Sequence, residues 1–161
     1  MKRLVSLFLP LAALLTTGCG SPLLDHANAN EILRQPISED VACPLAFPKF
    51  DLCGSFTWDR KPTSSTPGSA VLRFWNRELG TPSGPYVSPV STVFVKLWMP
   101  VMGHGSSPVT TAAKKDAGGM AILGVFDSTN VFFVMPGKWE IWVQLKSGAA
   151  IDAQAKLDVE I

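Results

Sequence analysis

The last eleven residues of the chain alternate between apolar and polar side chains. Every second position is apolar: Ile151, Ala153, Ala155, Leu157, Val159 and Ile161. The positions between them hold Asp, Gln, Lys or Glu. A period of two predicts a β-strand with one buried face. Similar alternation occurs at 69–78, 91–99, 131–135 and 138–146, and residues 120–126 form an apolar run.

Turn signals separate these predicted strands. Met135-Pro136-Gly137-Lys138 reads as a tight connection and predicts a hairpin over residues 131–146. The next turn is predicted at residues 146–149. Thirteen Pro and thirteen Gly point to many short elements and argue against an all-helical bundle. The expected fold is all-β, an immunoglobulin-like β-sandwich of about seven strands, with a small barrel as the alternative.

The N-terminus resembles a bacterial lipoprotein signal. Lys2 and Arg3 precede an apolar stretch, residues 4–17, that is too short for an ordinary membrane span. Small residues and then Cys19 follow, so we expect Cys19 to carry lipid. An ordinary secretory signal cleaved elsewhere is the alternative. The predicted division of the chain is a signal peptide at 1–18, a tether at 19–40 and a sandwich domain with a disulfide-bearing lead-in at 41–161.

The predicted address is the bacterial cell envelope. The mature domain would be held at the membrane by its lipid anchor. The residue after Cys19 is Gly and no Asp follows closely, which by resemblance to Gram-negative sorting signals favours the outer membrane, facing the periplasm. Export also exposes Cys43 and Cys53 to an oxidising compartment, so we expect them to form a disulfide. A metal-binding or redox pair is the alternative, but the spacing is not C-x-x-C.

Charge and motif content exclude several functions. Lys and Arg number 14 against 13 Asp and Glu, so the net charge of +1 gives no basic face for nucleic acid. The only histidines are His26 and His104. The sequence has no G-x-S-x-G motif, no phosphate-binding Gly loop and no paired carboxylates suited to acid–base work. We therefore do not expect an enzyme.

The segment LWMPVMGHGSSP, residues 97–108, is the one candidate for chemistry. Met99, Met102 and His104 lie within six residues at a predicted strand end, and glycines flank the histidine. Thioether and imidazole ligands suit Cu(I), whereas zinc favours Cys, His and carboxylate and calcium favours oxygen. Met120 or Met135 could complete the set, although both are expected mainly to pack. The alternative is that these methionines only fill the core and that His104 is a polar turn residue.

The string WMPVMGHGSSP, followed by VFFVMPGKWEIWVQL, resembles the FixH-like and YtkA-like group of exported or membrane-anchored β-sandwich domains. The resemblance covers residues 68–161 and includes a Met-x-Gly-x-Trp pattern matched by Met135, Gly137 and Trp139. Members are linked to copper delivery and to respiratory oxidase assembly. The resemblance implies Met99, Met102 and His104 as copper ligands, with a cuproprotein as partner. FixH-type proteins carry a membrane helix where this chain is predicted to carry lipid.

The expected function is therefore a lipid-anchored periplasmic protein that holds Cu(I), for delivery to a cuproenzyme or for copper homeostasis. The alternative is a metal-free immunoglobulin-like lipoprotein that binds an envelope protein or has a structural role. Trp75, Trp98 and Trp142 fall opposite the predicted core stripes, and we expect them to be buried. Three neighbouring exposed tryptophans would favour the interaction module.

Overall fold

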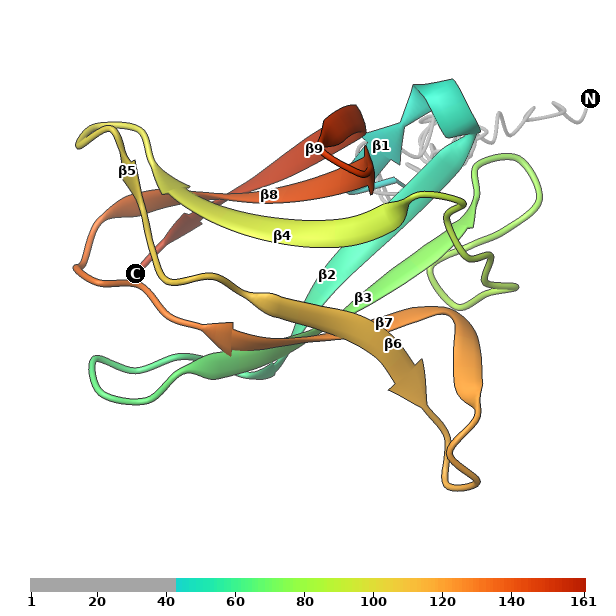
Figure 1. The fold of residues 1–161 in the computed structure, drawn as a ribbon, viewed down its shortest axis with the longest axis horizontal. Coiled ribbons are helices and arrows are strands. Elements are labelled where there is room, and N and C mark those ends of the chain that lie inside the picture. The colour runs from blue at the N-terminus through green and yellow to red at the C-terminus, as the bar shows by residue number, and fades with distance from the viewer. Residues whose placement is uncertain (1–42) are drawn as a thin grey trace, which may run out of the picture. The chain divides into compact units, whose positions relative to one another are not determined.

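Residues 43–161 are described by a computed structural model, and the predicted signal peptide, the tether and Cys19 lie outside them. Two antiparallel β-sheets pack face to face (Figure 1). The elements in chain order are β1 (Leu45–Phe47), the 3-10 helix η1 (Pro48–Phe50), β2 (Leu52–Arg60), β3 (Gly68–Asn76), β4 (Thr92–Met99), β5 (His104–Gly105), β6 (Thr110–Lys115), β7 (Ala121–Val131), β8 (Lys138–Ser147) and β9 (Ala150–Glu160).

The sheet arrangement confirms the predicted all-β sandwich. One sheet has the order β1-β2-β3-β7-β6 and the other β5-β4-β8-β9. Since β1 has three residues and β5 only two, the remaining strands match the expected number of about seven. Within residues 43–161, no helix has the length and apolar character needed to cross a membrane.

The core lies between the two sheets and follows the period-two pattern. On β4 the residues Val93, Val95, Leu97 and Met99 are all 6% exposed or less. The facing sheet contributes side chains such as Leu72 and Phe74, which are fully buried. Alternation along a strand thus places one residue in two against the opposite sheet, as the geometry of a pleated strand requires.

The predicted hairpin over 131–146 is wrong. Strand β7 ends at Val131 and β8 begins at Lys138, and the two strands belong to different sheets. The chain between them crosses from one sheet to the other at one end of the sandwich (Figure 1). Phe133 is nevertheless buried, at 5% exposure, because the crossing segment closes that end of the core. The next turn is as predicted, since β8 and β9 pair in an antiparallel hairpin.

The disulfide-bearing segment is part of the sandwich and does not merely lead into it. Leu45 and Phe47 on β1 are fully buried in the core. The predicted bond between Cys43 and Cys53 is present, and the pair forms a small second cluster with Trp75. Burial of Trp75, at 1% exposure, is therefore confirmed.

The other two tryptophans differ from the expectation. Trp98 and Trp142 are half-buried on the outer face of the β5-β4-β8-β9 sheet. Phe94, on the same face of β4, is 44% exposed. Their strands alternate as predicted, but no element of residues 43–161 forms a second layer over that face (Figure 1).

Candidate functional site

The end of β4 and the start of β5 bring two of the three predicted ligands together. Met99 and His104 are direct partners in the antiparallel pairing of these strands. Side chains of directly opposite residues lie on the same face of a sheet, with Cβ atoms about 4.5–5.5 Å apart. Met99 and His104 therefore meet at the rim of the core.

Glycines on both sides of His104 make this tight return possible. Gly103 has φ +67°, in the left-handed region that a residue without Cβ adopts at little cost, and its N–H donates to the carbonyl oxygen of Met99 at 2.9 Å. A Cβ on Gly105 would lie 2.9 Å from the carbonyl oxygen of Leu97. The backbone thus folds sharply enough to place the imidazole beside Met99, as the sequence predicts.

Met99 is held from the opposite side by the β7–β8 connection. Its side chain is 6% exposed and belongs to the core. A Cβ built on Gly137 would lie 2.7 Å from Met99 Cε, closer than real Cβ contacts. Gly137 therefore leaves the space that the Met99 methyl group occupies, and the Met99 thioether is fixed by packing rather than free to sample solvent.

The hydrogen bond of His104 fixes which ring nitrogen can bind a metal. Nδ1 lies 2.9 Å from the carbonyl oxygen of Gly105. A carbonyl oxygen only accepts, so Nδ1 carries the proton, and in the neutral ring Nε2 retains its lone pair. Metal-binding histidines commonly donate their second ring N–H to a backbone carbonyl or carboxylate in this way. With Nδ1 donating to this carbonyl, Nε2 is the ring nitrogen left with a free lone pair.

An aromatic wall borders the pair. The Trp139 ring lies edge-on to His104, with centroids 5.9 Å apart and planes at 74°. Phe133 packs on Trp139 at 5.3 Å, and the Trp139 indole N–H donates to the Met135 carbonyl oxygen at 3.1 Å. Trp139 is only 1% exposed, so the inner side of the site is apolar.

The remaining methionines lie in different places. Met102 is in the turn between β4 and β5 and is 57% exposed. Met135 belongs to the β7–β8 connection, which shares this end of the sandwich, and is 36% exposed. Met120 precedes β7, in the β6–β7 turn at the opposite end (Figure 1), and is 72% exposed. Met102 and Met135 are therefore placed near the rim, whereas Met120 cannot contribute.

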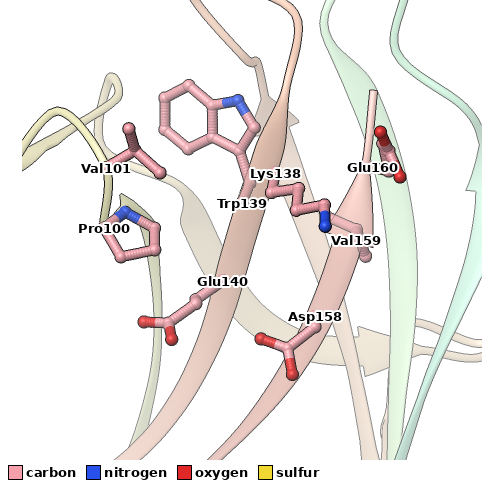
Figure 2. A pocket seen from close by; sticks show the side chains of 8 residues that line it. All are labelled: Pro100, Val101, Lys138, Trp139, Glu140, Asp158, Val159 and Glu160. Carbon is pink, nitrogen blue, oxygen red and sulfur yellow. The ribbon is translucent and has the colours of Figure 1, made fainter.

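A pocket of about 470 Å³ adjoins the same turn (Figure 2). Pro100 and Val101 of the turn form one wall, and residues of β8 and β9 form the other. Glu140 and Asp158 lie together at one end of the pocket, while Glu160 lies apart beside Val159 (Figure 2). These carboxylates do not converge: among residues 43–161, no group of three His, Cys, Asp or Glu side chains is placed to hold a metal ion.

Glu140 and Asp158 are instead held by Lys156. The Lys156 ammonium donates to Glu140 at 2.5 Å and to Asp158 at 3.2 Å. The bond from Lys156 to Glu140 and a 2.8 Å bond from the Trp142 indole N–H lower the pKa of Glu140. The two carboxylates raise the pKa of Lys156. The pocket therefore lacks the open cluster of oxygens that calcium or magnesium requires.

Comparison with protein-family models, with curated proteins and with solved structures finds no match for this chain. Two contributors were not singled out from residue types: the Trp139 wall and the space at Gly137. Both residues, Gly137 and Trp139, belong to the Met-x-Gly-x-Trp pattern on which the family resemblance is based, and that pattern could have indicated them.

Proposed function

We propose that this chain is a lipid-anchored protein of the bacterial envelope that binds one Cu(I) through Met99, Met102 and His104. The observation that carries the proposal is the cross-strand pair of Met99 and His104, with Nδ1 of His104 committed to the Gly105 carbonyl. A soft thioether and an imidazole Nε2 at one rim are the donors that Cu(I) prefers.

The surroundings favour a soft monovalent ion. A thioether is neutral and needs no deprotonation, so an apolar wall such as Trp139 carries no desolvation penalty for the ligand. Zinc would lack thiolate or carboxylate ligands here, since the acidic side chains nearby are directed elsewhere and held by Lys156.

Exposure of Met102 supports delivery over storage. Met99 is packed in the core, whereas Met102 lies in the turn with 57% of its surface exposed, so a movement of Met102 toward or away from the metal would not disturb the core. Three ligands also leave a coordination position for a donor atom of a partner. A cuproprotein of the envelope is the partner that fits this arrangement, with the lipid at Cys19 keeping the domain at the membrane.

The test is a competition titration of the full chain, in detergent and under reducing conditions, against a Cu(I) chelator. We expect wild type to take up one Cu(I). We expect His104→Ala and Met102→Ala to weaken binding by about tenfold or more, because loss of even an outer-shell partner of a metal ligand costs that much. Met120→Ala removes an exposed methionine at the far end and should leave affinity unchanged.

The titration has two outcomes that reject the site. One is that wild type takes up no copper. The other is that His104→Ala and Met102→Ala bind copper as tightly as wild type does. Either result would leave the metal-free interaction module as the function to pursue.

A further inference from the structure

The outer face of strands β4, β8 and β9 has a regular pattern of aromatic, amide and charged side chains. The pairing registers place these side chains in three rows across the sheet: Trp98, Glu140 and Asp158; Lys96, Trp142 and Lys156; Phe94, Gln144 and Gln154. Each row alternates with buried residues of the inner face. We refer to these nine residues as the outer grid.

The aromatic members of the outer grid form a zigzag. Trp142 on β8 lies one row from Trp98 and one row from Phe94, both on β4. Diagonal neighbours of this kind are about 7–8 Å apart, close enough for large side chains to form one continuous surface. Phe94 is 44% exposed and both tryptophans are half-buried. A lysine ammonium lies over each of the three rings, so a ligand reaches the ring faces by displacing these flexible side chains.

A shallow trough of about 260 Å³ runs along the outer grid. It is lined by Lys96, Trp98, Glu140, Trp142, Gln144, Ile151 and Gln154. Gln144 donates to the side-chain oxygen of Gln154 at 3.0 Å, which leaves the Gln154 amide N–H groups without a protein acceptor within residues 43–161. The trough therefore combines ring surface with open hydrogen-bond donors and is about the size of one or two sugar rings.

The charges of the outer grid are already compensated. Lys156 is bound to Glu140 and Asp158. Lys96 lies over the Trp98 ring at 4.3 Å from its centroid, and Lys146 of the next row lies over Phe94 at 4.8 Å. The outer grid itself holds two lysines and two carboxylates, so it has no net charge and a strongly charged ligand finds little complementarity there.

The composition also differs from that of a protein-binding surface. The centre of a protein interface is depleted in Lys, Glu and Asp. Here Trp142 is flanked by Lys96 and Lys156 within its own row. A sugar ring suits such a surface better, because its C–H faces are apolar while the hydroxyl groups around its edge donate and accept hydrogen bonds.

We propose that the outer grid binds a neutral polysaccharide of β-linked glucose-type rings. The C–H faces stack on Trp142, Trp98 and Phe94, and the hydroxyl groups bond with Gln154 and Lys96, while the buried Gln144 holds Gln154 in place. In β-linked glucose the ring substituents are equatorial, which leaves both faces flat enough to lie on a sheet. This binding is independent of copper, because the outer grid is on the opposite side of β4 and β8 from Met99.

The test is affinity electrophoresis of the full chain in detergent, in gels containing laminarin or hydroxyethyl cellulose. We expect at least one glucan to retard wild type, with equal retardation of copper-loaded and copper-free protein. Trp142→Ala and Trp98→Ala should weaken the interaction by about tenfold, and Gln154→Ala by a smaller factor. The control Leu123→Ala changes an exposed apolar residue on β7, in the other sheet, and should bind as wild type.

Several results would overturn the proposal. One is that neither glucan retards folded wild type, and another is that the tryptophan variants, shown folded by circular dichroism, are retarded as wild type is. Binding to heparin that salt abolishes and Trp142→Ala leaves intact would indicate an anionic ligand held by lysines. A dimer in sedimentation that Trp142→Ala converts to monomer would show that the outer grid is a protein interface.

Discussion

Strands β4 and β8 have two faces with opposite properties, although the residues of the two faces alternate one by one. On the inner face, Leu97 and Met99 are 6% exposed or less, and Trp139 is 1% exposed. On the outer face, Phe94 is 44% exposed and Trp142 is half-buried. The contrast teaches that one strand can fix the rim side chain of Met99 by packing while its other side remains exposed.

The largest expected effect is a difference in stability between two tryptophan variants of strand β8. Trp139→Ala should destabilise the protein by about 3–5 kcal/mol, because it removes a fully buried aromatic side chain from the core. Trp142→Ala, three residues along β8 and on the outer face, should cost less than about 1 kcal/mol. Urea unfolding of the non-reduced full chain measures both. Equal losses of stability would contradict the difference in burial between the two faces of β8.

A second prediction concerns two glycines with positive φ. Gly137→Ala should cost about 1–3 kcal/mol, because its Cβ would meet Met99 Cε and force repacking of the rim. Gly148→Ala is the matched control, since Gly148 also has positive φ but a Cβ there meets nothing within 4 Å. Both unfolding midpoints and Cu(I) affinities should be compared. If the rim binds copper, Gly137→Ala should lower the Cu(I) affinity and Gly148→Ala should leave it unchanged.

A third prediction separates the two roles at the rim. Met99→Ala should cost about 1–3 kcal/mol of stability as well as copper affinity, because Met99 is a core residue. His104→Ala should cost less than about 1 kcal/mol, from its edge contact with Trp139, while abolishing most copper binding. Thermal unfolding of the apo forms checks the stabilities. A larger loss at His104 than at Met99 would mean that the imidazole is structural.

The smallest expected effect is a loss of stability at low pH, and it arises from Glu140 on the outer face. Bonds from Lys156 and from the Trp142 indole N–H lower the pKa of Glu140 from its usual 4.5. This stabilisation is present above the unfolded-state pKa and is lost as pH falls through the lower folded-state pKa. Urea midpoints between pH 6 and pH 3 should fall slightly more steeply for wild type than for Glu140→Gln. Parallel curves would show that the Lys156 network adds nothing to stability.

The sequence predicted those parts of the fold that alternation alone determines. Residues 92–99 and 138–147 are strands with the expected faces inward. Residues 150–160 are also a strand, and its middle apolar residues pack against the core, but Ile151 and Ile161 at the two ends of the predicted buried face are 48% and 45% exposed. The supposed hairpin at 131–146 failed because Phe133 is buried equally well by a hairpin or by a crossing between sheets. A period-two pattern reports burial and not the partner strand.

The candidate site was predictable only in outline. The spacing of Met99 and His104, with a glycine on each side of the histidine, indicated that the chain turns back there. The contact of His104 with Trp139 depends on the strand order, in which β5 and β8 are the two neighbours of β4. The local sequence does not determine that order. Burial of Trp75 likewise depends on a distant bond, between Cys43 and Cys53, while nothing in residues 43–161 supplies a comparable layer over Trp98.

X-ray absorption at the copper edge of the Cu(I)-loaded full chain tests the central claim most directly. With Met99, Met102 and His104 as ligands, the spectrum should require two sulfur scatterers and one imidazole nitrogen in the first shell. Met102→Ala should remove one sulfur, while Met120→Ala should leave the spectrum unchanged. A first shell of nitrogen and oxygen alone, or one that Met102→Ala and His104→Ala do not alter, would contradict a copper site at this rim.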